Sequence, residues 1–313
     1  MFEKLFDQRS GLSLERLRGF VEVAKAGSIV KAAPGDKSRQ SALSRHIRDL
    51  EEFFATELTV RRGKTIAISE AGQRLAVITE AQLRDLEEFR SRQADEQRTF
   101  TIGSGASTTD WLIVPTVSAI SRLLDGASIS LETLRSRDLV RAVADGSVDF
   151  AIVREDALPN GEKCKRRILR MTFHLCIPNK LLRKGVTPAM LDQPSIWSQL
   201  PFAAGKGGGQ LDTRLRTIMA DAGVDFHPFV ECKSMLQARQ FIERGECAGV
   251  LPSIGLRGLS PTDTTIREFK PFRDYGRQLV LHWNARQMRR RDIADATPAA
   301  IAEVIKRSAV AAF

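Results

Sequence analysis

Apolar residues at helical spacing, broken by short polar segments, characterise the beginning of the chain. The first run repeats every three or four residues: Leu14, Leu17, Phe20, Val21 and Ala24. Such a repeat places apolar side chains on one face of a helix. Ser13 suits the N-cap position, and Gly27 suits the position where a helix ends. The pattern predicts a first helix between these two residues.

Two further helices and a hairpin are predicted next. Ser28 is a second N-cap, here for a short helix that runs to Ala33, and the breaker Pro34-Gly35-Asp36 follows it. A longer basic helix then covers residues 38–54. Between residues 58 and 69 the apolar positions alternate around a basic tip, which predicts a β-hairpin. Three helices followed by a hairpin are typical of a winged helix-turn-helix domain.

A long uninterrupted helix is predicted after the hairpin. No proline occurs in residues 70–97, and no glycine follows Gly72 there. Apolar residues form one stripe along it: Ala71, Leu75, Ile78, Leu83, Leu86 and Phe89. At 1.5 Å per residue this helix is about 40 Å long, too long to bury its stripe against a small domain. We expect the stripe to pack against a second copy of the chain or, alternatively, against the body of its own chain.

The remainder of the chain alternates short apolar strands with helical segments. Strands are expected at 100–102, 129–134, 148–153, about 171–173, 201–203, 229–230, 249–251 and 278–283. A helix over residues 138–145 separates the second strand from the third. This alternation indicates an α/β domain with parallel sheets covered by helices on both faces. Its length, roughly 210 residues, is enough for two lobes.

Composition and charge narrow the function classes. Lys and Arg number 48 against 38 for Asp and Glu, and the net charge of +10 favours a polyanionic partner. The four cysteines form no C-x-x-C pair, so a zinc site or disulfide framework is not expected. The most apolar segment, residues 111–120, is about half as long as a membrane span, and residues 1–10 lack the apolar run of a signal peptide. We expect a cytoplasmic chain with reduced thiols, no metal, no cofactor and no membrane partner.

The N-terminal domain predicted above, residues 12–69, is called the head. Its basic side chains gather on two predicted elements. Residues 37–48 contain four basic residues and no acid, and the hairpin tip adds three more basic residues. The first turns of such a helix enter the major groove in helix-turn-helix proteins. The candidate DNA contacts are Ser28, Arg39, Gln40, Ser41, Ser44, Arg45, Arg48, Arg61, Arg62 and Lys64. Because Gln suits adenine and Arg suits guanine, we expect Gln40, Ser44 and Arg45 to read bases and the arginines and lysine around them to contact phosphates. An ordinary solvated helix face is the alternative.

Spaced residues between positions 17 and 72 form a specific pattern. They are Leu17, Phe20, Val23, Ala24, Gly27, Ser28, Ala32, Ala33, Gln40, Ser44, Arg45, Ile47, Leu50, Glu51, Arg62, Ala71 and Gly72. This pattern resembles the DNA-binding domain of LysR-type transcriptional regulators. The resemblance is close over residues 12–72 and extends to the rest of the chain in layout and length.

Several positions depart from the family pattern. Asp36 stands where a buried leucine is expected, and Pro34-Gly35 break the second helix early. Ser41 replaces a proline, Phe54-Ala55 stand for Leu-Gly, and Thr59 stands for a phenylalanine. These changes affect the turn and the bases that are read, but they leave the basic face in place. The alternative is therefore an N-terminal domain whose DNA-binding function has decayed.

The resemblance implies a multi-domain fold. We expect an N-terminal winged helix-turn-helix (mainly α with a β wing), a long linker helix and a C-terminal two-lobed α/β domain like that of periplasmic binding proteins. The winged helix-turn-helix is expected at residues 12–69, with its helix-turn-helix at 28–47. The linker or dimerisation helix is expected at 70–98 and the effector-binding domain at 99–313. Within that domain, lobe I covers about 99–170 plus 275–313, and lobe II covers about 171–274. The implied partners are double-stranded operator DNA, a small-molecule effector, RNA polymerase and further copies of the chain in a homodimer or homotetramer.

Two loops are candidates for the effector site. Residues 103–109 and 205–210 each follow a strand and precede a helix, one in each expected lobe. Open α/β sheets bind ligands at such positions, and helix N-termini favour anions. The candidate effector contacts are Ser104, Ala106, Ser107, Thr108, Arg135, Ser136, Lys206, Gly207 and Ser234. We expect a small anionic effector; the alternative is a set of caps and turns that bind nothing.

Catalytic motifs are incomplete in this sequence. Gly205-Lys206 is not a P-loop because Gly207 follows the lysine, and Thr108 occupies the third glycine position of a dinucleotide motif that starts at Gly103. We therefore expect a transcription regulator and not an enzyme. Two other classes stay open. One is an α/β small-molecule-binding protein or nucleotide-dependent enzyme with an incidental basic head, and the other is an architectural DNA-binding protein without an effector.

Overall fold

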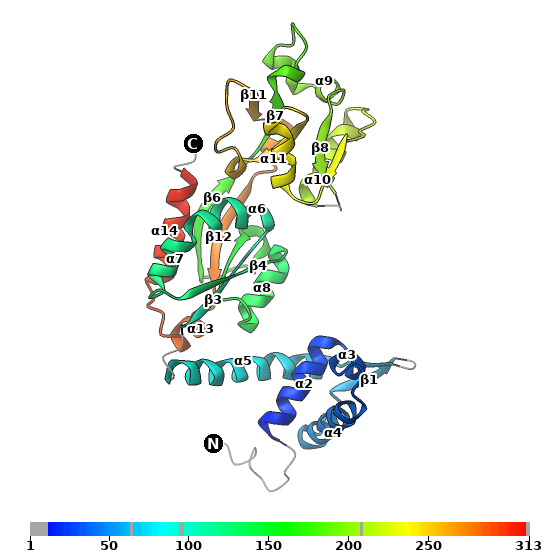
Figure 1. Ribbon diagram of the computed structural model, residues 1–313, viewed down its shortest axis with the longest axis vertical. Coiled ribbons are helices and arrows are strands. Elements are labelled where there is room, and N and C mark those ends of the chain that lie inside the picture. The colour runs from blue at the N-terminus through cyan, green and yellow to red at the C-terminus, as the bar shows by residue number, and fades with distance from the viewer. Residues whose placement is uncertain (1–11, 63–64, 94–96, 207–208, 269, 311–313) are drawn as a thin grey trace. The chain divides into compact units, whose positions relative to one another are not determined.

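The computed structural model describes residues 12–62, 65–93, 97–206, 209–268 and 270–310. The chain divides into two compact units, Met1–Arg98 and Thr99–Phe313. Figure 1 shows the first unit as helices with a small hairpin and the second as strands covered by helices. None of the described helices has the length and apolar character needed to cross a membrane.

The first unit contains helices packed around one apolar core. Its elements are α2 (Leu14–Ala26), α3 (Ile29–Ala32), α4 (Lys37–Phe54), β1 (Thr59–Arg62), β2 (Thr65–Ile68) and α5 (Glu70–Gln93). The buried core residues are Phe20, Val23, Ala33, Leu43, Ile47, Leu50 and Leu58. Burying a side chain such as Phe20 or Leu50 contributes about 1.5–3 kcal/mol, so this small core holds the three helices and the hairpin together.

Side-chain caps set the ends of the first helices. The Ser13 hydroxyl accepts a hydrogen bond from the Arg16 backbone N–H at 3.2 Å, and the Ser28 hydroxyl accepts one from Lys31 at the same distance. Gly27 ends α2 with φ of 74°, a left-handed conformation that glycine adopts without strain. The N-caps and the stop residue expected from the sequence are confirmed.

The turn between α3 and α4 explains one departure from the family pattern. Gly35 has φ of 78° and reverses the chain after Pro34. Asp36 is the N-cap of α4: its Oδ1 accepts the Arg39 backbone N–H at 2.9 Å. Where the family pattern has an apolar residue, this chain therefore has a capping carboxylate, which stabilises a helix N-terminus by about 1 kcal/mol.

Glu51 connects the end of α4 to the hairpin. Its Oε1 accepts three hydrogen bonds of 2.9 Å, from the backbone N–H groups of Leu58 and Thr59 and from the Thr59 hydroxyl. Thr59, another departure from the family pattern, thus supplies a polar anchor in place of an aromatic one. Nearby, Gly72 approaches the hairpin so closely that an added Cβ would lie 2.2 Å from the Leu58 carbonyl oxygen.

Helix α5 is about 36 Å long, from 24 residues at 1.5 Å each. Leu75 and Ala76 pack against the core of the first unit, and Lys25 of α2 pairs with Glu80 at 2.9 Å. Further along, Ile78, Leu86 and Phe89 expose 61%, 52% and 64% of their surface. Part of the predicted stripe therefore packs inside the first unit, and these three residues face solvent.

The second unit contains two five-stranded sheets. The first has the order β4 (Ser128–Thr133), β3 (Thr99–Ser104), β5 (Phe150–Arg154), β12 (Arg277–Trp283) and β6 (Lys165–Met171). The second has the order β11 (Thr264–Glu268), β7 (Phe173–Pro178), β10 (Ala248–Pro252), β8 (Phe202–Gly205) and β9 (Val230–Cys232). Each sheet forms one lobe with its helices.

Helices cover the sheets and meet separate apolar clusters. They are α6 (Ala106–Thr108), a π-helical turn (Thr109–Ile113), α7 (Val117–Leu123), α8 (Ser136–Asp145), α9 (Pro194–Trp197), α10 (Gln210–Asp221), α11 (Met235–Glu243), α12 (Lys270–Arg273), α13 (Ala285–Arg290) and α14 (Thr297–Val310). Short 3₁₀ turns occur at Val114–Thr116, Glu155–Ala157, Asn179–Leu181, Pro188–Asp192 and Ser253–Gly255. In the first lobe α7 and α14 share a cluster with Phe100 and Ile152, whereas α8 packs on the other face with Val153.

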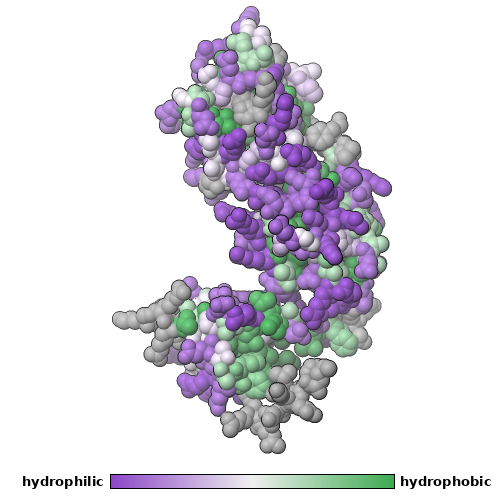
Figure 2. Space-filling model, turned by 180° about the vertical axis from the view of Figure 1, so that it is seen from behind, coloured by the Kyte–Doolittle hydropathy of each residue, from purple (hydrophilic) through white to green (hydrophobic). Residues whose placement is uncertain are grey.

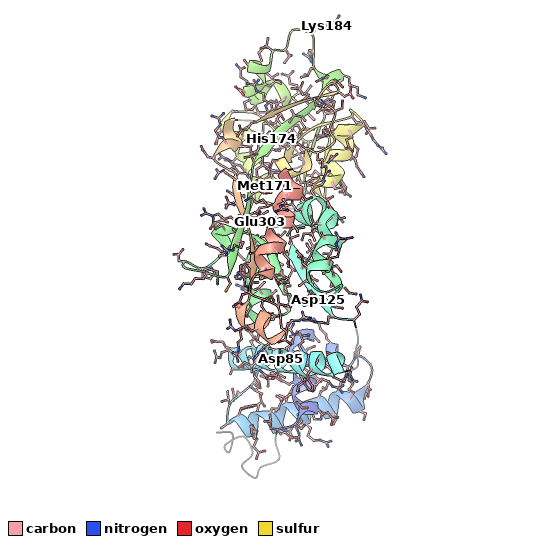
Figure 3. The ribbon with its side chains drawn as sticks, turned by 90° about the vertical axis from the view of Figure 1, so that its left-hand side faces the viewer. Asp85, Asp125, Met171, His174, Lys184 and Glu303 are labelled. Atoms are coloured by element: carbon pink, nitrogen blue, oxygen red, sulfur yellow. The ribbon has the colours of Figure 1, made fainter. Side chains whose placement is uncertain are left out.

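The expectation of parallel sheets is correct for only part of each sheet. Strands β3, β4 and β5 are parallel, but β12 runs antiparallel to both β5 and β6. In the second lobe β7 is likewise antiparallel to β10 and β11. The cause is the chain path, because the chain crosses from one lobe to the other between Met171 and Phe173 and returns between β11 and β12. Figure 3 labels Met171 and His174 along the first crossing.

Strands β6 and β11 were not expected. The sequence of β6, Lys-Arg-Arg-Ile-Leu-Arg-Met, is mostly charged, and it lies at the edge of the first sheet, where β12 is its one neighbour in the strand order. Charged residues at an edge prevent pairing with other chains and hide the apolar alternation that signals a strand. The strand expected near residues 171–173 begins at Phe173 and continues to Pro178. The other expected strands are present, with ends within about two residues of those predicted.

Candidate nucleic-acid interface and ligand pocket

Helix α4 presents a basic and polar face opposite its buried one. Leu43, Ile47 and Leu50 point into the core. The exposed side chains of the helix include Lys37, Ser38, Arg39, Ser41, Arg45 and Arg48. Arg45 and Arg48, three residues apart, form no ion pair with any residue that the structure describes. Their charges are therefore available to an anionic partner.

Five of the predicted DNA contacts on α4 fall into two groups, one exposed and one bonded within the first unit. Ser41, Arg45 and Arg48 are exposed on α4. Gln40, in contrast, donates its side-chain amide to the Ala33 carbonyl at 2.7 Å, and so it fixes the turn between α3 and α4. Arg39 is also engaged, because its Nη2 lies 2.7 Å from Glu22 Oε2 on α2.

The remaining predicted contacts lie in the turn or on the hairpin. Ser28 caps α3, and Ser44 is half-buried on α4. Arg61 and Arg62 belong to β1, which pairs with β2 in antiparallel register, but their side chains lie outside the described part of the structure. Lys64 lies outside the described residues altogether. Sequence reasoning missed Glu51 as the residue that holds the hairpin; its three bonds join groups seven and eight residues apart.

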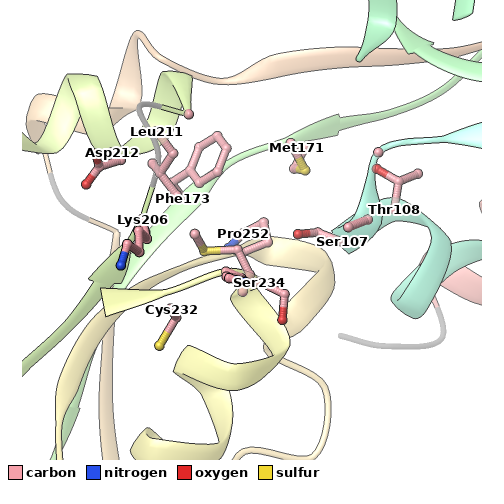
Figure 4. Close-up of a pocket in the computed structure, with 16 residues that line it drawn as sticks. Ser107, Thr108, Met171, Phe173, Lys206, Leu211, Asp212, Cys232, Ser234 and Pro252 are labelled. Carbon is pink, nitrogen blue, oxygen red and sulfur yellow. The ribbon is translucent and has the colours of Figure 1, made fainter. Parts of the chain in front are cut away.

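A cavity of about 280 Å³ lies between the two lobes of the second unit. Figure 4 shows side chains from both lobes around it. Its lining consists of Gly105, Ala106, Ser107, Thr108, Met171, Phe173, Gly205, Lys206, Gly209, Leu211, Asp212, Cys232, Lys233, Ser234, Met235 and Pro252. This volume is close to the lower end of the range for small-molecule sites.

The lining combines an apolar wall with a few polar groups. Met171, Phe173 and Leu211 form part of the wall, and Lys206 and Lys233 bring two positive charges. Asp212 is the carboxylate among the lining residues: Oδ2 lies 3.2 Å from the Arg216 Nε, while Oδ1 is buried without a hydrogen-bond partner. A ligand with an apolar body, an anionic group and a hydrogen-bond donor matches these groups chemically.

Five of the predicted effector contacts belong to this lining: Ala106, Ser107, Thr108, Lys206 and Ser234. Three others do not. Ser104 is fully buried and bonded to the Thr109 hydroxyl at 2.6 Å. Arg135 is the N-cap residue of α8, and the Ser136 hydroxyl accepts the Arg154 backbone N–H at 3.4 Å. Gly207 lies outside the described residues.

Sequence reasoning missed the apolar half of the pocket. Met171 and Phe173 lie at the crossing between the lobes, and Leu211 and Asp212 lie in the first turn of α10. They are ordinary core residue types, so no local motif marks them. The one available signal is position in the sequence, since Leu211 and Asp212 directly follow the glycine-rich loop at residues 205–210.

Cys232 also lines the pocket but is poorly suited to react. Burial raises the pKa of the Cys232 thiol, so the reactive thiolate is less populated. The four cysteines all lie in the described part of the chain and are free thiols, three of them buried and Cys164 half-buried. Among the described residues no group of His, Cys, Asp or Glu is arranged to hold a metal ion.

Family comparisons fit both sites. Residues 14–73 match the model of the bacterial regulatory helix-turn-helix protein, lysR family, and residues 93–296 match the LysR substrate binding domain. The chain belongs to the LysR family. This assignment agrees with the resemblance seen in the sequence, and the family that the two models describe is one of regulatory proteins, not of enzymes.

Curated relatives of this LysR-family chain are distant. It is 27% identical over 199 residues to the HTH-type transcriptional regulator PecT of Dickeya dadantii, and the aligned region covers 62% of this chain and 60% of PecT. It is 28% identical over 139 residues to TdcA of Escherichia coli K12, which covers 42% of this chain and 44% of TdcA. The matches thus span about half the length of these relatives.

Solved structures share the fold. A full-length OxyR variant from Pseudomonas aeruginosa is similar with a TM-score of 0.56, 18% identity and coverage of 95% of this chain and 94% of that one. CbnR, a LysR family transcriptional regulator, gives a TM-score of 0.55 at 14% identity, covering 95% and 99%. The predicted fold class, a winged helix-turn-helix, a long helix and a two-lobed α/β domain, is confirmed.

Proposed function

We propose that this LysR-family chain is a sequence-specific regulator that binds double-stranded operator DNA through α4 and the β1–β2 hairpin. Acting on chromosomal DNA, it works in the cytoplasm, with RNA polymerase as a further partner. The observation that carries the proposal is the exposed face of α4, where Arg45 and Arg48 are free of ion pairs among the described residues. The preceding turn, fixed by Gln40 and Asp36, is the support such a helix needs to enter a groove.

The structure supports a revised division of roles on α4. Arg45 and Ser41 are the proposed base readers, because both are exposed in the first half of the helix. Arg48 is proposed to contact phosphate. Gln40 acts by holding the turn in the unbound state, and it reads a base only if its bond to the Ala33 carbonyl breaks.

We infer that the active form is at least a dimer that packs through α5. Ile78, Leu86 and Phe89 lie on one side of this helix and are more than half exposed. Figure 2 also shows hydrophobic residues gathered on the first unit, whereas hydrophilic residues cover most of the visible face of the second. Two heads in one dimer would match two half-sites about 34 Å apart.

The pocket between the lobes is proposed to bind a small anionic effector. Lys206 and Lys233 supply charge, Ser107 and Ser234 supply hydroxyls, and the wall around Phe173 encloses an apolar body. The effector controls DNA binding only as far as it binds one arrangement of the lobes and heads more tightly than another.

The DNA part is tested by the salt dependence of duplex binding. Each neutralised phosphate adds about 0.9 to the slope of log K against log salt concentration. Arg48→Ala should therefore lower the slope by about one. Arg18→Ala, a matched control whose side chain on α2 is 66% exposed, should leave it unchanged. An equal slope for wild type and Arg48→Ala would contradict the phosphate contact.

The effector part is tested by thermal unfolding of the full chain with a panel of carboxylate and phosphate metabolites. A ligand that stabilises the wild type should stabilise Lys206→Ala much less. Lys184→Ala removes a lysine that Figure 3 shows far from Met171, and it should keep the full effect. If Lys206→Ala is stabilised as strongly as the wild type, the pocket is not the effector site.

A further inference from the structure

Four arginines lie near Tyr275, the single tyrosine of the chain, where the chain returns from the second lobe to the first. The Arg277 guanidinium carbon lies 3.9 Å from the centre of the Tyr275 ring. Arg170 lies against the next residue, because a Cβ added to Gly276 would be 2.9 Å from its Nε. The cluster is thus built on neighbouring strands, β6 and β12.

Arg154 and Arg214 bring the remaining charges from the two lobes. Arg154 ends β5 of the first lobe and donates from Nη1 to the Gln210 side chain at the start of α10 in the second lobe. Arg214 stands four residues after Gln210, so it lies on the same side of α10. Burial raises the pKa of the Tyr275 hydroxyl. The positive charges of Arg277, Arg154 and Arg214 act in the opposite direction and lower this pKa by a smaller amount.

The positive charge of this cluster is only partly balanced. Arg154 has a carboxylate neighbour, Asp156, at 3.6 Å. Arg170 and Arg277 form no ion pair with any residue in the described ranges. In addition, the Arg277 Nε is buried and has no hydrogen-bond partner. Buried donors without a partner are costly, and guanidinium groups match phosphate and carboxylate oxygens in paired geometry.

The cluster lies next to the pocket but is not part of its lining. Phe173, which lines the pocket, packs against Tyr275 with ring centres 5.2 Å apart. Met171, another lining residue, is the register partner of Arg277. Gln210 bonds to Arg154 while its neighbour Leu211 lines the pocket. The arginine cluster therefore borders the pocket at the interface between the lobes.

We propose that Arg154, Arg170, Arg214 and Arg277 form a second anion-binding subsite around Tyr275, and that the effector carries a second acidic group, a phosphate or a carboxylate, that binds there. This inference rests on the proposed function, because it assigns the chemistry of the same effector. An anion at this place contacts arginines from both lobes and so favours an arrangement in which the two lobes stay together.

Tyr275 provides a direct readout because it is the only tyrosine in the chain. Its ionisation can be followed in the full-length protein by ultraviolet difference absorbance. A bound anion cancels part of the arginine charge that stabilises the phenolate, so it should raise the Tyr275 pKa. The probes are inorganic phosphate, succinate and, as monoanion control, acetate, each compared with chloride at equal ionic strength.

The expected result is a rise of the Tyr275 pKa with phosphate or succinate and none with acetate. A response to phosphate alone would assign the second group as a phosphate, and a response to succinate alone would assign it as a carboxylate. Arg214→Gln should weaken the binding of the active probe by about tenfold or more, as measured by the probe concentration needed for thermal stabilisation near neutral pH. Arg257→Gln, which changes an exposed arginine of the second lobe outside the pocket lining, is the control and should bind the probe as tightly as the wild type.

An unchanged Tyr275 pKa with all probes, or a response equal to that of acetate, would overturn the proposal. So would an Arg214→Gln variant that binds the probe as tightly as the wild type. The proposed function is tested separately, by the Lys206→Ala and Arg48→Ala measurements. The pKa of Tyr275 reports anion binding at the arginine cluster independently of DNA binding.

Discussion

Glu51→Ala should loosen the hairpin without unfolding the head. The Glu51 carboxylate accepts three hydrogen bonds of 2.9 Å at one oxygen, two of them from backbone N–H groups. Hydrogen bonds to a charged group are worth about 1.5–3 kcal/mol each when buried. Glu51 is half-buried and water replaces part of the loss, so we expect a total of about 2–3 kcal/mol.

Hydrogen exchange measures this loss locally in the full-length chain. Because 1.4 kcal/mol corresponds to a factor of ten, the backbone amides of Leu58 and Thr59 should exchange about 30-fold faster or more in Glu51→Ala. Thr59→Val, which removes only the hydroxyl bond, should show a smaller increase. Glu52→Ala is the control, since Glu52 is exposed and its side chain bonds to no described residue. Wild-type exchange rates in Glu51→Ala would refute the reasoning.

Three more predictions concern packing, assembly and thiol reactivity. Gly72→Ala should destabilise the head by about 1–3 kcal/mol in urea unfolding, because the new methyl group would lie 2.2 Å from the Leu58 carbonyl oxygen; an unchanged midpoint would show that the backbone adjusts freely. The double variant Ile78→Ser/Phe89→Ser should raise the dimer dissociation constant at least about 30-fold in sedimentation experiments, whereas Val30→Ser, which alters an equally exposed residue of α3, should not. Burial raises the pKa of Cys176 to about 12, so this thiol should resist alkylation in the native protein at pH 8 while half-buried Cys164 reacts first; early labelling of Cys176 would contradict its burial.

Local signals made the head predictable from its sequence. Ser13, Gly27 and Ser28 act through contacts within four residues, and such contacts leave a direct trace in the sequence. The family pattern also pointed to the right fold. It did not reveal that Asp36 would cap α4 or that Gln40 would bond to Ala33, because these bonds depend on how the turn bends in three dimensions.

The body was harder to predict because its important contacts are distant in sequence. Strand β6 is charged and lacks clear alternation, yet it pairs with β12 about a hundred residues later. The antiparallel returns of β7 and β12 follow from the crossing between the lobes, which no local motif announces. The pocket shows the same limit: the glycine-rich loops supplied Ser107 and Lys206, while Met171 and Phe173 came from the crossing itself.

The most direct test of the account is selection of bound duplexes from a random DNA pool by the full-length chain, compared with Arg45→Ala. We expect the wild type to enrich a motif with two-fold symmetry and half-sites about 34 Å apart, as a dimer of helix-turn-helix heads requires. Arg45→Ala should relax the preference at one base position in each half-site. Salt-dependent binding without any enriched motif, or the same motif from both proteins, would contradict sequence readout by α4.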